Sequence, residues 1–69
     1  MDYQTFAIET LAQVRVMLRA VPAADRSAHW QMADRHAKLA RLWVKRERWN
    51  LAANGAETAE FHAKRAIAI

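Results

Sequence analysis

Hydrophobic positions in the first twenty residues recur at alternating steps of four and three. The positions that follow this spacing are Tyr3, Ala7, Thr10, Val14, Met17 and Val21. Such spacing places them on one stripe of an α-helix, which predicts a helix over residues 2–20. Ile8, Ala12 and Val16 form a second apolar line on a different side. We therefore expect this helix to contact a second helical neighbour, for which another subunit is one source.

The first helix ends at the only proline of the chain. Pro22 disfavours the α conformation at Val21, which stops the helix there. The next helix restarts at Asp25 or Ser27, because either side chain can accept hydrogen bonds from the free N–H groups of a first turn. A connection this short predicts that the second helix lies antiparallel to the first.

The second helix has one mainly apolar side and one basic side. The mainly apolar side holds Ala28, Met32, Ala33, His36, Leu39, Ala40, Leu42 and Trp43. The opposite side holds Asp34, Lys38, Arg41, Lys45 and Arg48. Past residue 46 a new stripe begins, with Trp49, Ala52, Ala56, Ala59, Ala63 and Ala66. On an unbroken helix this stripe would emerge on the basic side, so either the chain breaks or a partner covers the second face.

Two short segments could break the helix between the second and third apolar stripes. Asn54-Gly55 is a strong helix-stop signal, since glycine readily adopts the left-handed conformation just past a last turn. The alternative is Arg46-Glu47-Arg48. We expect the break at Asn54-Gly55, which gives helices over residues 2–20, 25–53 and 56–68.

Six residues match the small and aromatic positions of one tetratricopeptide hairpin. They are Leu39, Ala40, Trp43, Trp49, Ala52 and Ala59. The segment 33–66 thus resembles one unit of that family, which implies a helical hairpin that turns near residue 47 and binds protein. The chain departs from the family at Ala56, where a bulky aromatic is preferred, and in having no second repeat to stack on.

The size and composition of the chain favour a small helical domain. Its 69 residues include 54% hydrophobic residues, one glycine, one proline and no cysteine. We therefore expect one all-α domain over 1–69, an antiparallel hairpin or three-helix domain. A chain of this size buries only about 60% of its unfolded surface, so without disulfides we expect dimerisation as a helical bundle. The expected self-association residues are Ile8, Val16, Ala59, Phe61 and Ala63.

Positive charge is concentrated in one segment. The net charge is +4, and residues 35–48 contain six basic side chains against the single acid Glu47. On the second helix Lys38, Arg41, Lys45 and Arg48 follow one line, with Trp49 beside it. This line is either a solvated face or a contact for phosphates or an acidic protein patch. We take these five residues as the candidate partner-binding site.

Side chains that usually carry catalysis or bind metals are scarce. The chain has no cysteine, one serine and one glycine, which leaves no nucleophile elbow or phosphate loop. His29 and His36 are seven residues apart, about 10 Å along a helix, and Ala33 between them offers no ligand. We expect no enzymatic activity, no cofactor and no metal.

Nothing in the chain predicts a membrane or export segment. MDYQTFAIET has no basic flank before an apolar run, and no uncharged stretch reaches about 18 residues. We therefore expect a cytoplasmic protein that makes no membrane contact.

Together these patterns predict a non-enzymatic protein interaction module. We expect a small regulator, or an inhibitor of the phage or plasmid type, that binds a larger host protein with an acidic patch. The alternative is a nucleic-acid-binding accessory protein that uses the basic line of the second helix.

Overall fold

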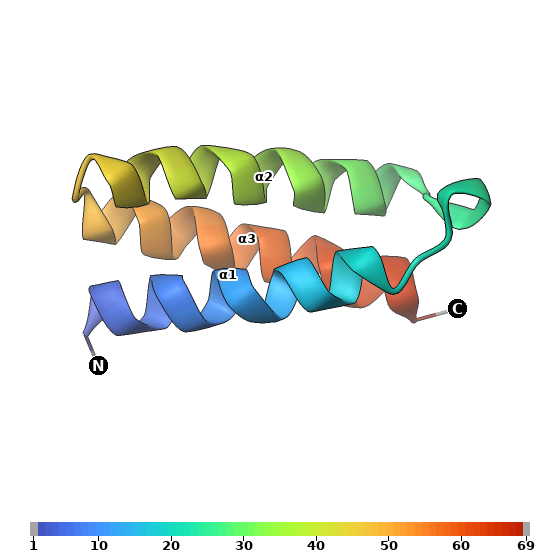
Figure 1. Ribbon diagram of the computed structural model, residues 1–69, viewed down its shortest axis with the longest axis horizontal. Helices are drawn as coiled ribbons and strands as arrows, with labels where there is room; N and C mark the ends of the chain where they lie inside the picture. Colours follow the sequence, from blue (N-terminus) through green and yellow to red (C-terminus); the bar gives the residue numbers. More distant parts are fainter. Residues whose placement is uncertain (1, 69) are drawn as a thin grey trace.

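The computed structural model describes residues 2–68 and contains three α-helices in that range. They are α1 (Tyr3–Arg19), α2 (Ala28–Lys45) and α3 (Trp49–Ile67), with a short 3-10 turn, η1 (Ala23–Asp25), between α1 and α2. The bundle measures 35 × 19 × 14 Å. Helix α2 runs antiparallel to α1 and α3, and the described ends of the chain lie at opposite ends of the bundle (Figure 1). The all-helical prediction is confirmed.

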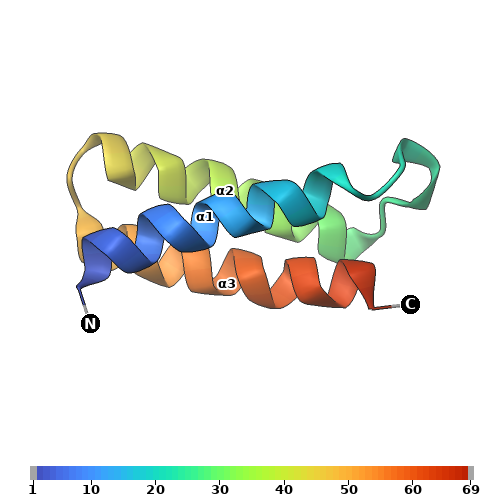
Figure 2. The same cartoon turned by 60° about the horizontal axis from the view of Figure 1, so that its bottom comes forward.

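Helix α3 is the shared neighbour of the other two helices. It packs closely on both α2 and α1, whereas α1 and α2 contact each other much less. Figure 2 shows α1 lying over the α2–α3 pair. Helix α1 thus has two helical neighbours within the chain, but the apolar line Ile8, Ala12 and Val16 that predicted a second neighbour stays exposed. No helix within residues 2–68 has the length and apolarity needed to cross a membrane.

Side-chain caps fix where α1 and α2 begin. Asp2 accepts hydrogen bonds from the Gln4 backbone N–H at 2.9 Å and the Thr5 hydroxyl at 2.7 Å. The Thr5 hydrogen bond is the main reason that the pKa of Asp2 lies below its usual value. Ser27 accepts from the backbone N–H of Trp30 at 3.3 Å. Of the two predicted restart residues, Ser27 is therefore the cap, and Asp25 belongs to η1.

The predicted break at Asn54-Gly55 is wrong, because the chain turns at residues 46–48. Glu47 adopts a left-handed conformation with φ 56°. The backbone N–H groups of Glu47 and Arg48 donate to the carbonyls of Val44 and Trp43 at 3.0 and 2.9 Å. These two bonds form a Schellman motif, which ends α2 and reverses the chain direction. The turn lies where the tetratricopeptide resemblance placed it.

Gly55 is used for close packing instead of for a turn. It lies inside α3 and faces α2, where an added Cβ would come within 3.0 Å of the Ala40 Cβ. The missing side chain therefore lets the two helices approach. A glycine in a sequence can therefore mark either a helix end or, as Gly55 does here, a close contact between two helices.

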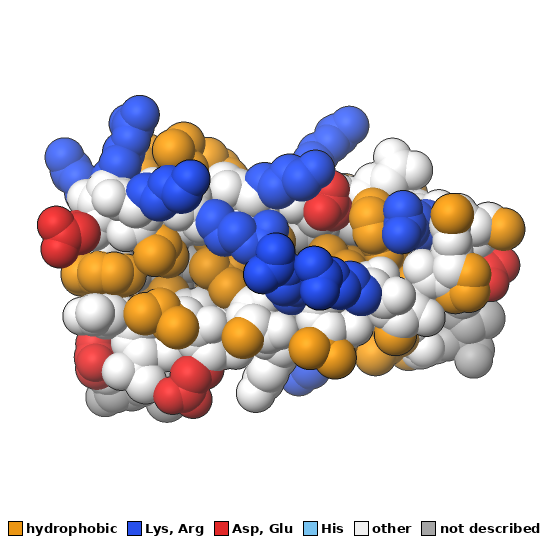
Figure 3. Space-filling model, viewed as in Figure 1, with side chains coloured by type: hydrophobic (Ala, Val, Ile, Leu, Met, Phe, Trp, Pro, Cys, Tyr) orange, Lys and Arg blue, Asp and Glu red, His pale blue; other side chains and the backbone are white. Residues whose placement is uncertain are grey.

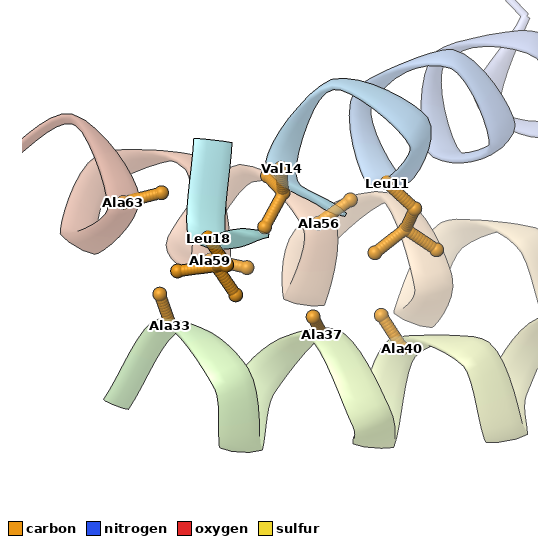
Figure 4. Packing of buried hydrophobic residues seen from close by; sticks show 9 residues of the cluster. All are labelled: Leu11, Val14, Leu18, Ala33, Ala37, Ala40, Ala56, Ala59 and Ala63. Atoms are coloured by element: carbon orange, nitrogen blue, oxygen red, sulfur yellow. The ribbon is translucent and has the colours of Figure 1, made fainter. Parts of the chain in front are cut away.

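The core combines alanines from two helices with larger side chains from the third. The α2–α3 seam consists of Ala33, Ala37, Ala40, Ala56, Ala59 and Ala63, all fully buried. Leu11, Val14 and Leu18 of α1 close over it (Figure 4). A second cluster contains Ala7, Ala52 and Ala53, with Phe6, Trp43 and Val44 packed against it. Ala59 and Ala63, expected at a self-association surface, instead pack inside one chain.

The apolar side predicted for the second helix is only partly buried. Met32, Leu39 and Leu42 are 41 to 47% exposed. Ala33, Ala37 and Ala40 occupy the fully buried face of α2, whereas the longer side chains of this side stay partly exposed. The hydrophobic pattern thus predicted the correct side of α2, but not that only Ala33, Ala37 and Ala40 on that side are buried.

Candidate interaction site, a basic groove between two helices

The surface between α1 and α2 is hollowed, because both helices pack on α3 more closely than on each other. Figure 3 shows Lys and Arg side chains gathered along this boundary, with hydrophobic side chains beside them. One hollow of about 360 Å³ is lined by Ile8, Leu11, Ala12, Arg15, Arg41, Val44 and Lys45. A second, of about 150 Å³, is lined by Arg15, Leu18, Arg19, Arg26, Trp30, Asp34 and Arg41. The two share Arg15 and Arg41, so they form one surface, here called the α1–α2 groove.

Basic side chains dominate the charge of the groove. Five line it, namely Arg15, Arg19, Arg26, Arg41 and Lys45, against the single acid Asp34. Asp34 pairs with Lys38 at 2.9 Å, outside the groove lining. The other ion pair among residues 2–68 joins Lys64 to Glu60. The five basic groups of the groove thus keep their hydrogen-bond donors available for an anion from outside the described chain.

The two ends of the groove differ in chemistry. At one end the lining is aliphatic, with Ile8 47% exposed and Leu11 and Val44 beneath it. At the other end Trp30 forms a wall beside Arg19 and Arg26. The Arg15 and Arg41 side chains lie where the ends meet. An occupant therefore meets an apolar floor and cationic sides together.

Two contacts hold the indole ring of Trp30, which forms the wall at this end of the groove. The Trp30 indole N–H donates to the Leu18 carbonyl at 2.9 Å, which ties α2 to the end of α1. The Arg26 guanidinium carbon lies 4.2 Å from the centre of the Trp30 ring, a cation–π contact. Both contacts hold this end of the groove in shape.

No family model matches the chain, and neither a curated protein nor a solved structure matches it. None of these comparisons supports the tetratricopeptide resemblance, which rests on six residues of the sequence.

The structure brings together only part of the predicted partner-binding line. Arg41 and Lys45 line the groove. Lys38 is engaged by Asp34, and Arg48 lies in the turn before α3. Trp49 is the half-buried first residue of α3. The predicted line assumed that the second helix continues through residues 48 and 49. Helix α2 ends at Lys45, so the line ends there as well.

Sequence reasoning missed the contribution of other segments to the same surface. Arg15 and Arg19 come from α1, and Arg26 from the connection before α2. In the sequence these arginines lie outside residues 35–48, in the part of the chain whose basic and acidic residues nearly balance. Only the folded structure brings them beside Arg41 and Lys45. A usable signal existed, because Arg15 and Arg19 are four apart and thus neighbours on one helix face.

The exposed residues expected for self-association do not form one patch. Ile8 belongs to the α1–α2 groove, whereas Val16, 70% exposed, lines a separate hollow with Met17 and Ile67. Phe61 lies on α3, with the Arg65 guanidinium carbon 4.5 Å from its ring centre. The exposed members therefore present separate apolar contacts on different parts of the bundle.

Proposed function

We propose that this protein is a non-enzymatic interaction module that binds an acidic segment of a larger protein in the α1–α2 groove. The observation that carries the proposal is the groove itself, in which Arg15, Arg41 and Lys45 border an aliphatic floor and two further arginines line the adjoining tryptophan end. An amphipathic segment with acidic flanks matches both features, its apolar side chains on the floor and its carboxylates against the arginines. Arginine and tryptophan are also the residue types that most often dominate binding energy.

The floor favours a protein over a nucleic acid as the occupant. Nucleic-acid backbones are held mainly by charge, which needs no aliphatic surface at the centre of the contact. Here Ile8 and Leu11 lie next to Arg15, where an inserted aliphatic or aromatic side chain would be desolvated. A module that occupies an acidic surface acts by changing what that surface binds. This is the action of a small regulator or of an inhibitor of the phage or plasmid type.

The test is affinity capture from a lysate of the encoding organism with matched variants. Arg15→Gln with Arg41→Gln removes two charges from the centre of the groove. Arg35→Gln with Arg46→Gln removes the same charge from exposed positions outside its lining. We expect the wild type and the second variant to capture the same polypeptide after nuclease treatment, and the groove variant to lose it.

Salt and nuclease separate the proposal from the nucleic-acid alternative. Binding of nucleic-acid phosphates by the five cations of the groove should fall up to about 500-fold between 50 and 200 mM salt. A groove contact with an apolar floor loses much less over the same range. Capture that nuclease treatment abolishes, or that both variants weaken equally, would overturn the proposal.

Self-association remains part of the proposal, through Val16 and Phe61, because Ile8 lines the groove that the partner would fill. Each is an aliphatic or aromatic side chain about half exposed or more, and a second copy would remove such area from water. Sedimentation equilibrium across a concentration series tests this directly. We expect a dimer that Val16→Ser or Phe61→Ser weakens, and a monomer at every concentration would contradict it.

A further inference from the structure

Three histidines that are far apart in the sequence meet at one edge of the α2–α3 seam. His29 and His36 lie on α2, and α3 places His62 between them. The Nδ1 atoms of His29 and His62 are 3.0 Å apart, with the ring centres at 5.2 Å. The rings of His36 and His62 lie parallel at 6.0 Å. The ligand missing between the two α2 histidines is thus supplied by another helix.

We propose that His29 and His62 form a two-histidine site for a divalent transition-metal ion such as Zn²⁺, Ni²⁺ or Cu²⁺. Imidazole nitrogen is a preferred ligand for these ions. Two Zn–N bonds of about 2.0–2.1 Å at a tetrahedral angle separate their nitrogens by about 3.3 Å. The observed 3.0 Å differs by a few tenths of an ångström, which small side-chain rotations provide. The two Nδ1 atoms form a hydrogen bond across the seam, in which one ring donates to the other. A bound ion would replace the shared proton, with both rings then carrying their hydrogen on Nε2.

The surroundings of His62 favour its neutral form. A histidine binds metal only as neutral imidazole. The pKa of His62 lies below its usual value, first because of desolvation and then because of the charges of His29, His36 and Arg65. These are the charged groups that act on His62 from α2 and α3. Because protons compete with a metal ion for imidazole nitrogen, metal binding should weaken as the pH falls.

The site has two protein ligands, with water in the remaining positions. Within residues 2–68 no group of three or more His, Asp or Glu side chains is arranged to hold one ion. His36 faces His62 ring to ring and is not a ligand, which makes it a matched control. The positive charge of Arg65 acts on His62 and would repel a cation there, so Arg65→Gln should tighten metal binding severalfold.

A bound ion would join α2 to α3 where the seam otherwise consists of alanines. His29 lies two residues after the Ser27 cap and directly before Trp30, the wall of the groove. The ion would therefore stabilise the fold and fix the first turn of α2. This inference does not depend on the partner proposed above.

The experiment measures thermal unfolding of the whole chain at pH 7.5 during ZnCl2 titration. We expect the midpoint to rise with metal concentration in the wild type and in His36→Ala. A free metal concentration about 100-fold above Kd multiplies the folding equilibrium constant about 100-fold. His29→Ala and His62→Gln should abolish the rise. His29 is exposed, so its removal leaves the core intact.

Cu²⁺ provides a second readout through tryptophan fluorescence. Because Trp30 adjoins His29, bound Cu²⁺ should quench its emission, and EDTA should restore it. His29→Ala should show neither effect, and at pH 5 the wild type should lose both. An unchanged midpoint in the wild type, equal responses in His29→Ala, or binding that persists at pH 5 would each overturn the site.

Discussion

The α2–α3 seam is a buried interface of small residues, whereas the α1–α2 groove is an exposed surface lined by large basic residues. The seam is made of alanines and one glycine, so two helix backbones approach closely and leave no room for charge. The groove lies between helices that barely contact each other, and long arginine side chains line it. The small residues on one face of α2 allow close packing on α3, and the large basic residues on another face of α2 therefore remain accessible in the groove. Since α3 takes the close contact with α2, α1 can only lie across the pair.

The two surfaces also contribute unequally to stability. A methyl group buries little area, so the alanines mainly determine how close the helices lie. The larger transfer free energy comes from Leu11, Val14 and Leu18 of α1. We therefore expect substitutions to destabilise the protein most where α1 closes the core, and least at the groove arginines.

The largest expected effect is at the α1 contact. Leu18 is 5% exposed, and Leu18→Ala should cost about 2–5 kcal/mol through lost transfer and an unfilled cavity. Leu39→Ala, at a 47% exposed position on α2, should cost below about 1 kcal/mol. Urea unfolding followed by circular dichroism measures both. Equal losses would mean that α1 does not close the core.

The next effect tests the close approach in the seam. Gly55→Ala should lower stability by about 1 kcal/mol, because the 3.0 Å contact with Ala40 outweighs the gain in helix propensity. Asn54→Ala, at the exposed neighbouring position, should instead be neutral or stabilising. A stabilised Gly55→Ala variant would show that the helices are further apart than described.

A smaller effect of opposite sign is expected at the turn that joins the seam helices. Glu47 has φ 56°, a conformation that costs non-glycine residues about 1–2 kcal/mol. Glu47→Gly should therefore raise the free energy of unfolding by about 0.5–1 kcal/mol, after the entropy cost of glycine is counted. Glu47→Ala keeps the strain and serves as the control. A destabilised glycine variant would argue against the Schellman turn.

The smallest effect on stability is expected in the groove. Arg15→Gln with Arg41→Gln removes no ion pair given by the structure, so the free energy of unfolding should change by less than about 0.5 kcal/mol. The same variant should lose its partner in the capture experiment. A stability loss above about 1 kcal/mol would instead assign these arginines to holding the bundle together.

Sequence patterns predicted the helices better than the way they meet. The 4-3 spacing in the first helix and the stop at Pro22 were confirmed, since both depend on local geometry. Gly55 misled the prediction because the same residue serves a turn or a close packing contact, and only tertiary structure distinguishes the two. The turn at Glu47 carries no glycine and so gave no strong local signal.

The candidate site was only half predictable for a related reason. Arg41 and Lys45 were found because they share a helix face. Arg15 and Arg19 were counted with a near-neutral remainder, although α1 brings them to the same groove. His62 is the parallel case, since a ligand from another helix cannot be seen in spacing along α2.

The close α2–α3 seam is the claim on which the groove depends, and NMR tests it most directly. The structure predicts a nuclear Overhauser effect between the Gly55 α-protons and the Ala40 methyl group, with slow amide exchange through residues 54 and 55. An absent cross-peak together with fast exchange at Asn54 and Gly55 would place the helix break there and contradict the account.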